Sequence, residues 1–114
     1  MIDNIVSRVD INRVNLKTMI VVRITCINKD NGDHNDPHEA ITHYGWIKDN
    51  GEYGKSTREV MVNFIKDGGQ AYVVDQYGNK VYCYVRESSR GTKFLQTYSD
   101  NRYTNNLLEL PECK

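Results

Sequence analysis

The residues best suited to chemistry gather in one polar loop between two strand-like runs. The loop contains the only histidines of the chain and several carboxylates, which are His34, His38, His43, Asp30, Asp33, Asp36 and Glu39. The spacing of His34 and His38 falls within the range of zinc-finger histidine pairs, and His43 with Cys26 could complete a set of four ligands. The aspartates could instead offer oxygen ligands to a hard cation.

Neither metal pattern is complete in this loop. Counted from Asp30, the glycine comes too early for an EF-hand and the closing glutamate is absent, and no C-x-x-C pair is present to anchor zinc. Aspartates in such loops commonly accept hydrogen bonds from their own backbone and so build turns. We expect structural turns without a bound metal, while a metal site or another ligand site at His34, His38 and His43 remains an alternative.

A second candidate site lies on the segment 80–86. Alternation there puts Val81, Cys83 and Val85 on one face and a row of aromatic and basic side chains on the other, namely Lys80, Tyr82, Tyr84 and Arg86. Tyrosines between basic residues on a sheet are how many proteins stack single-stranded nucleic acid, and neighbouring strands could add Tyr72, Lys93 and Tyr98. Such a face also serves protein contacts and dimerisation, and tyrosine is in any case a good strand former.

The aromatic pair Tyr44 and Trp46 forms a third candidate. In an extended segment 40–47 these side chains point away from His43 and the isoleucines around it. If the isoleucines face the core, Tyr44 and Trp46 are exposed binding anchors and His43 is a half-buried structural residue. If the aromatic face is the buried one, His43 lies at the surface, and the alternation alone allows both arrangements.

Motifs for catalysis are missing. Gly54-Lys55-Ser56-Thr57 resembles a phosphate-binding loop, but Asp49 stands where that motif needs its first glycine. The sequence has no nucleophile elbow and no dinucleotide-binding loop, so we name no catalytic residue, no metal and no cofactor, and expect a protein that is not an enzyme.

The elements that would position these residues follow from periodicity. Ser56-Thr57-Arg58-Glu59 reads as a capping box, so a helix is predicted over about Thr57–Lys66 with a buried stripe of Val60, Met61, Phe64 and Ile65. Strands are predicted over Met19–Lys29, about Ala40–Ile47, Ala71–Asp75, Lys80–Arg86 and Thr92–Tyr98. This order, β-β-α-β-β-β, predicts an α+β fold: an antiparallel sheet of about five strands with one amphipathic helix on one face.

Length and charge restrict the organisation and the partners. A chain of 114 residues is one domain, here 18–114, preceded by an N-terminal appendage 1–17. Equal numbers of basic and acidic residues (15 each) give no overall attraction to nucleic acid or membrane. No apolar run is long enough to span a membrane, so we expect a cytoplasmic protein. The three cysteines, Cys26, Cys83 and Cys113, are too few and too scattered for a disulfide framework, and Cys26 and Cys83 are expected to be reduced core residues.

Two segments carry a family resemblance: the run I-T-H-Y-G-W, and the tail N-N-L-L-E-L-P-E-C, whose three leucines are expected to pack on the core. Together with N-D-P-H-E-A and G-K-S-T-R-E, they resemble a small bacterial and phage family known only as a domain of unknown function. The resemblance covers roughly residues 20–114 and implies no activity. The residues themselves favour a binding or adaptor module that contacts a protein partner or a second copy of itself. The alternatives are a single-stranded nucleic-acid binder and a metal-binding protein.

Overall fold

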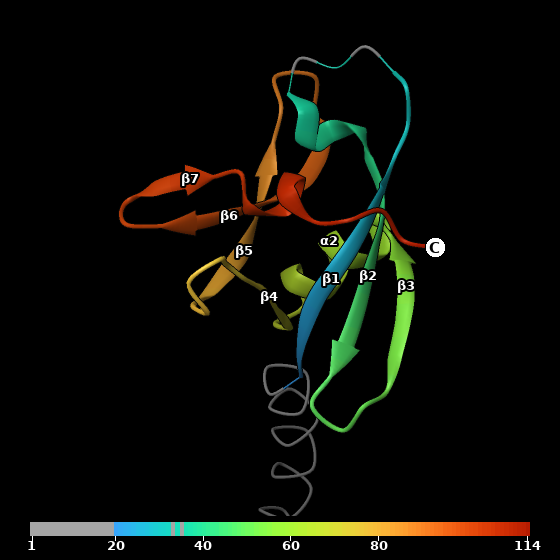
Figure 1. Ribbon diagram of the computed structural model, residues 1–114. Helices are drawn as coiled ribbons and strands as arrows, with labels where there is room; N and C mark the ends of the chain where they lie inside the picture. Colours follow the sequence, from blue (N-terminus) through green and yellow to red (C-terminus); the bar gives the residue numbers. More distant parts are fainter. Residues whose placement is uncertain (1–19, 33, 35) are drawn as a thin grey trace, which may run out of the picture.

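In the part of the chain that the structure describes, one α-helix packs on a seven-stranded, strongly curled sheet, which gives an α+β fold (Figure 1). The computed structural model describes residues 20–32, 34 and 36–114, so the predicted appendage 1–17 lies outside the described part. In chain order the elements are β1 (Val21–Lys29), the 3-10 turn η1 (Pro37–Ala40), β2 (Ile41–Lys48), β3 (Tyr53–Thr57), α2 (Arg58–Lys66), β4 (Gln70–Val74), β5 (Lys80–Glu87), β6 (Lys93–Ser99), β7 (Arg102–Thr104) and the 3-10 turn η2 (Asn106–Glu109).

The strand order is β3-β2-β1-β4-β5-β6-β7, which corrects the prediction of five antiparallel strands. The pair β1–β4 is parallel, and it joins only Val21–Arg23 to residues 70–72. Two strands were missed. β3 includes residues 54–57, for which no strand was predicted, and its extended form depends on pairing with β2. β7 is a short strand that follows a tight turn after β6.

Two irregularities in the β1–β2 pair decide which side chains face the core. The register shifts between Ile24 and Cys26, and again between Asn28 and Lys29. The first shift puts Ile27 on the same face as Ile24 and turns Cys26 to the other face, against the expectation that Cys26 is a core residue. Ile27 is accordingly 2% exposed, whereas Cys26 is only partly buried.

The helix α2 begins one residue later than the predicted capping box requires. Thr57 is the N-cap residue, and its hydroxyl accepts a hydrogen bond from the Val60 amide at 3.2 Å. Ser56 lies in β3 instead and accepts a hydrogen bond from the Trp46 indole. The buried face also differs, because Met61 and Val62 are enclosed while Val60 is 55% exposed.

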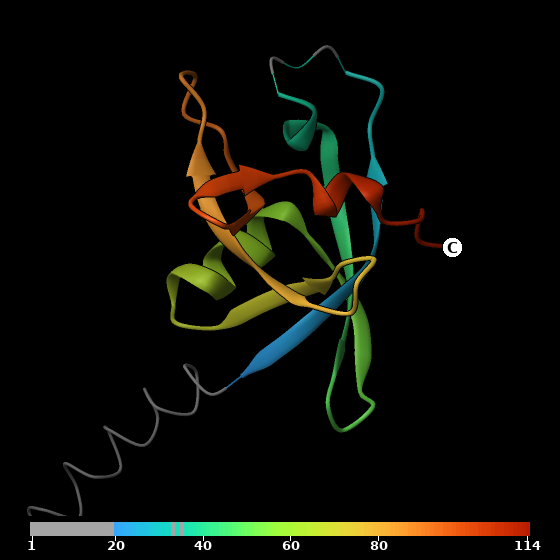
Figure 2. The same ribbon diagram turned by 60° about the vertical axis from the view of Figure 1, so that its left-hand side comes forward.

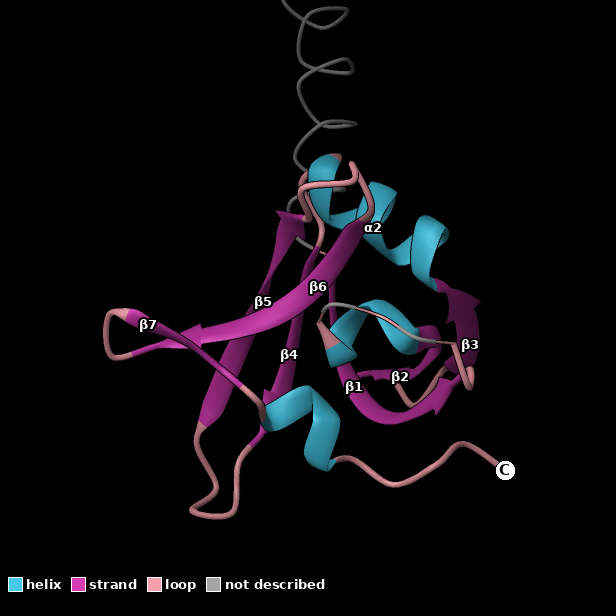
Figure 3. Ribbon diagram, turned by 90° about the horizontal axis from the view of Figure 1, so that it is seen from above, coloured by secondary structure: helices cyan, strands magenta, loops and turns pink. Residues whose placement is uncertain are grey.

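The core lies inside the curl of the sheet. Seen from above, α2 closes one side of this curl and β6 runs past both α2 and η1 (Figure 3). In the turned view of Figure 2, η2 follows the β6–β7 hairpin and leads to the C-terminal tail. As predicted, the tail leucines pack on the core, Leu107 fully and Leu108 and Leu110 in part. Among the described helices, none is long and apolar enough to cross a membrane.

Candidate functional site

Strand β5 alternates as its sequence predicts. Val81 and Cys83 are 5% and 4% exposed, whereas Tyr84 on the opposite face is half exposed. Antiparallel pairing places Tyr72 of β4 opposite Tyr82, and their rings lie 5.7 Å apart. The amine of Lys80 lies 4.8 Å from the centre of the Tyr72 ring, so this cation already has an aromatic partner.

The same face of the sheet carries three exposed tyrosines: Tyr84 on β5, Tyr98 on β6 and Tyr103 on β7. The rings of Tyr84 and Tyr98 are 6.0 Å apart, and those of Tyr98 and Tyr103 are 5.0 Å apart. Both contacts are edge to face, at 85° and 75°, which is a favourable arrangement for aromatic pairs. Tyr98 was anticipated from the sequence. Tyr103 was missed because the strand β7 that carries it was missed.

Arg86 stacks on this cluster. Its guanidinium lies 4.2 Å from the centre of the Tyr103 ring and 5.9 Å from that of Phe94. It also donates a hydrogen bond to the side-chain oxygen of Gln96 at 2.8 Å, and Gln96 in turn donates to the carbonyl of Thr104. We call the set Tyr84, Arg86, Tyr98 and Tyr103 the tyrosine surface. Lys93, also anticipated here, instead lies near Lys66 of α2, because its pairing with Glu87 puts it on the helix side of the sheet.

The aromatic pair of β2 is not an exposed anchor. Tyr44 is fully buried, since its face of β2 looks into the core. Burial raises the pKa of the Tyr44 hydroxyl above its ordinary range, and the backbone of Leu95 lowers this pKa by a smaller amount. Trp46 is half buried beside the core, with its indole N–H donating to Ser56 at 3.0 Å. The proposed contact role of Tyr44 is therefore wrong. The second register shift explains the ambiguity, because it lets Ile41 and Tyr44 both face inward.

Two aspartates, Asp30 and Asp36, build turns as expected in the polar loop between β1 and η1, which we call the histidine loop. Asp30 accepts hydrogen bonds from the Gly32 amide at 2.9 Å and from the ring of His34 at 2.8 Å, and these bonds lower the pKa of Asp30. A carboxylate oxygen of Glu39 lies 3.8 Å from the other ring nitrogen of His34. His34 is thus held between two carboxylates.

His38 is the most enclosed of the three histidines. Its ring nitrogen Nδ1 lies 2.8 Å from a carboxylate oxygen of Asp36, which also accepts a bond from the His38 amide. Partial burial raises the pKa of Asp36, but these bonds outweigh burial and lower it overall. The ring stacks on Phe94, and its Nε2 has no hydrogen-bond partner among the described residues.

The three histidines do not converge. His43 lies half-buried on the outer face of β2, with its Nδ1 2.9 Å from the hydroxyl of Thr42, apart from the pairs made by His34 and His38. Within residues 20–32, 34 and 36–114, no group of three or more histidine, cysteine, aspartate or glutamate side chains is arranged to hold a metal ion.

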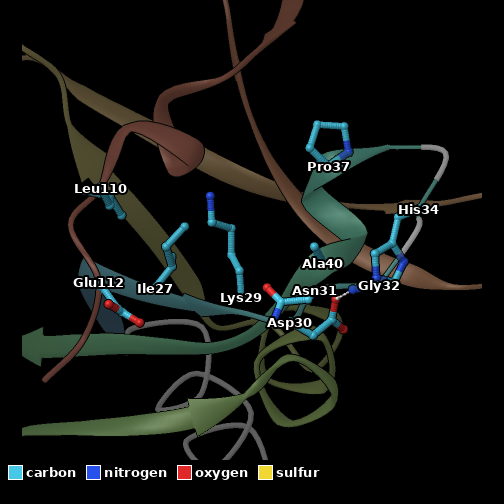
Figure 4. Close-up of a pocket in the computed structure, with 10 residues that line it drawn as sticks. All are labelled: Ile27, Lys29, Asp30, Asn31, Gly32, His34, Pro37, Ala40, Leu110 and Glu112. Carbon is cyan, nitrogen blue, oxygen red and sulfur yellow. Dashed lines mark hydrogen bonds and ion pairs between the residues drawn. The ribbon is translucent and has the colours of Figure 1, made fainter.

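A hollow of about 680 Å³ lies between the histidine loop and the C-terminal tail (Figure 4). Its walls come from β1, the loop, η1 and the tail, and include Lys29, Asp30, His34, Leu110 and Glu112. Of these residues, the sequence had indicated only the loop positions. The contribution of the tail depends on long-range packing, which no local pattern reports.

The sequence of this chain matches a family model. The model is described as protein of unknown function (DUF3892), and it covers residues 23–111. The chain belongs to this family. No curated protein and no solved structure matches it.

In this DUF3892 chain, the two segments that carried the resemblance meet in space. Cys113 of the tail forms a disulfide with Cys26, with their Cα atoms 4.9 Å apart. Gly45 of the I-T-H-Y-G-W run lies against both sulfurs: a Cβ there would be 2.2 Å from the sulfur of Cys26 and 2.9 Å from that of Cys113. The expectation that Cys26 is a reduced core residue is therefore wrong. The register shift before Cys26 turns it to the outer face, where the tail crosses.

Proposed function

We propose that this DUF3892 protein is a non-enzymatic binding module that contacts a partner protein through the tyrosine surface. The observation that carries this proposal is the edge-to-face packing of three exposed tyrosine rings, with the guanidinium of Arg86 stacked on one of them. Tyr84, Tyr98 and Tyr103 are 50%, 39% and 41% exposed. Tyrosine and arginine, together with tryptophan, are enriched among the residues that contribute most of the binding energy at protein interfaces.

Preorganisation supports this reading. Binding normally requires flexible side chains to be immobilised, at about 0.5–1.5 kcal/mol for each. Here each ring of the tyrosine surface already contacts the next, and Arg86 is held by both Tyr103 and Gln96. A partner that covers this surface therefore orders few new side chains.

Single-stranded nucleic acid is the second candidate, because rings flanked by Lys80 and Arg86 could stack bases. Two observations favour a protein partner. Both cations already lie over tyrosine rings, and the whole chain has a net charge of zero. Long-range attraction to phosphates is correspondingly weak.

The test compares Tyr98→Ala and Tyr103→Ala with Tyr77→Ala as the matched control. Tyr77 is 79% exposed but lies in the β4–β5 turn, away from the rings of the tyrosine surface. We expect a partner captured by the wild-type protein, or self-association measured by sedimentation, to be retained by the control. Each of the other two variants should weaken it by about 30-fold, corresponding to about 2 kcal/mol.

A labelled oligo-dT probe separates the two candidates. Tight, salt-dependent binding of this probe that is lost in Tyr98→Ala would replace the protein proposal with the nucleic-acid one. If both variants retain every contact of the wild-type protein, the tyrosine surface has no binding role.

A further inference from the structure

The C-terminal tail occupies the place of a missing strand beside β1. β4 pairs with β1 only as far as Arg23, so the later half of β1 has no neighbouring strand on that side. There the amide of Ile27 donates to the carbonyl of Pro111 at 3.0 Å, and the Cys113 amide donates to the carbonyl of Ile27 at 3.0 Å. Figure 1 shows this segment crossing beside β1 before it ends at the C-terminus.

Few contacts hold the end of the tail apart from the disulfide. Beyond the two backbone bonds at Ile27, the side-chain amide of Asn28 donates to the Cys113 carbonyl at 3.1 Å. Pro111, Glu112 and Lys114 are exposed, and the last leucine packed against the core is Leu110. The covalent bond is therefore the main restraint on the segment 111–114.

The disulfide is accessible, whereas the third cysteine is not. Cys26 and Cys113 are both partly exposed and line a hollow of about 420 Å³ together with Trp46. Cys83 is 4% exposed in the core, and burial raises the pKa of its thiol to about 12. A thiol that is buried and protonated does not exchange, so exchange is confined to the partly exposed pair Cys26 and Cys113.

The tail also forms a wall of the hollow in Figure 4. Leu110 and Glu112 face it from one side, and the loop residues Asp30 and His34 from the other. Movement of the tail would therefore open this hollow and uncover the backbone groups of Ile27.

We propose that Cys26 and Cys113 form a thiol–disulfide switch that holds the C-terminal tail beside β1, where the tail forms one wall of this hollow. The reductant is a dithiol. One of its thiolates attacks a sulfur of the disulfide, which gives a mixed disulfide and releases the other cysteine. The second thiolate of the dithiol then displaces the remaining cysteine, so the reductant leaves as a cyclic disulfide and both cysteines end as thiols. In the reduced state the tail leaves β1, and in the oxidised state the disulfide keeps the tail paired with β1.

The test is hydrogen exchange of the full-length protein, oxidised and after dithiothreitol. We expect amide exchange at Ile27 and Cys113 to become at least about 10-fold faster on reduction, because their hydrogen bonds join the tail to β1. The β5–β6 hairpin (80–99) serves as the internal control: it should stay protected, and its exchange should accelerate less than that of Ile27 and Cys113, by no more than the lost disulfide lowers the global stability. Cys113→Ser without reductant should behave like the reduced protein.

Alkylation under native conditions tests the chemistry separately. The reduced, folded protein should take up two labels, at Cys26 and Cys113, and the oxidised protein none. Unchanged exchange at Ile27 after verified reduction would overturn the switch, since the tail would then be held without the disulfide. Equal acceleration in the hairpin and at Ile27 would also overturn it, because both would then exchange only through global unfolding.

Discussion

Gly45 gives the sharpest test of the packing between the tail and β2. We consider Gly45→Ala in two backgrounds: the wild-type oxidised protein, and the double variant Cys26→Ala with Cys113→Ala. In the oxidised protein the new methyl group would lie 2.2 Å from one sulfur and 2.9 Å from the other, so the strand or the disulfide must move.

The loss of folding free energy caused by Gly45→Ala has a lower estimate, from overpacking, and an upper estimate, from complete loss of the disulfide. Forcing an extra carbon into a packed site typically costs about 1–3 kcal/mol. If the disulfide cannot form at all, its whole contribution is lost. A separation of 87 residues gives about 4–5 kcal/mol from loop entropy alone, and disulfides typically contribute about 2–4 kcal/mol. Gly45→Ala should therefore destabilise the oxidised protein by about 1–4 kcal/mol.

In the background without sulfurs the same substitution meets no such obstacle. Gly45 does not adopt a positive φ, so alanine fits the strand backbone, and the change there should be within about 0.5 kcal/mol. Urea denaturation of the four proteins gives the coupling energy, which we expect to be at least about 1 kcal/mol. An equal effect of Gly45→Ala in both backgrounds would refute the contact between Gly45 and the disulfide.

Three further predictions concern the core and the helix. Met61→Ala should destabilise the protein by about 2–5 kcal/mol in urea denaturation, whereas Val60→Ala, at an exposed neighbouring position, should cost no more than about 0.5 kcal/mol; comparable costs for both changes would restore the predicted stripe. Thr57→Ala removes the N-cap acceptor of α2 and should cost about 1 kcal/mol, with a loss of helical circular dichroism on mild heating. Burial raises the pKa of the Cys83 thiol from 9.0 to about 12, so the folded state holds this proton more tightly than the unfolded state. The stability contributed by the neutral thiol is therefore complete below pH 9 and is lost as the pH rises from 9 towards 12; thermal melts should show a smaller alkaline loss for Cys83→Ala than for the wild-type protein.

The sequence predicted the fold class and the alternation of β5, because both rest on local periodicity. It could not place the faces of β1 and β2, since each register shift inserts one residue that no composition signal marks. It also misplaced the helix cap. Ser56 and Thr57 are both good cap residues, and only the pairing of β3 with β2, which commits Ser56 to Trp46, decides between them.

One missed element did carry a local signal. β7 follows β6 through Asp100 and Asn101, which adopt positive φ angles of 55° and 67°. Consecutive Asp and Asn between strand-like runs favour the two-residue hairpin that this geometry requires. Attention to that pair would have predicted a hairpin and brought Tyr103 to the side of Tyr98. The disulfide had no comparable signal, because its cysteines lie 87 positions apart.

The two proposals concern neighbouring parts of one continuous segment, since η2 connects β7 to the tail. Leu107 of η2 is fully buried, and between it and the segment 111–114 Leu108 and Leu110 pack on the core in part. Because the Leu107 side chain is enclosed in the close-packed core, it anchors the backbone between β7 and the tail. The tail can therefore leave β1 while β7 keeps Tyr103 against Tyr98. It follows that reduction should change the exposure of Ile27 and leave the tyrosine surface unaltered, so binding at that surface should be independent of the redox state.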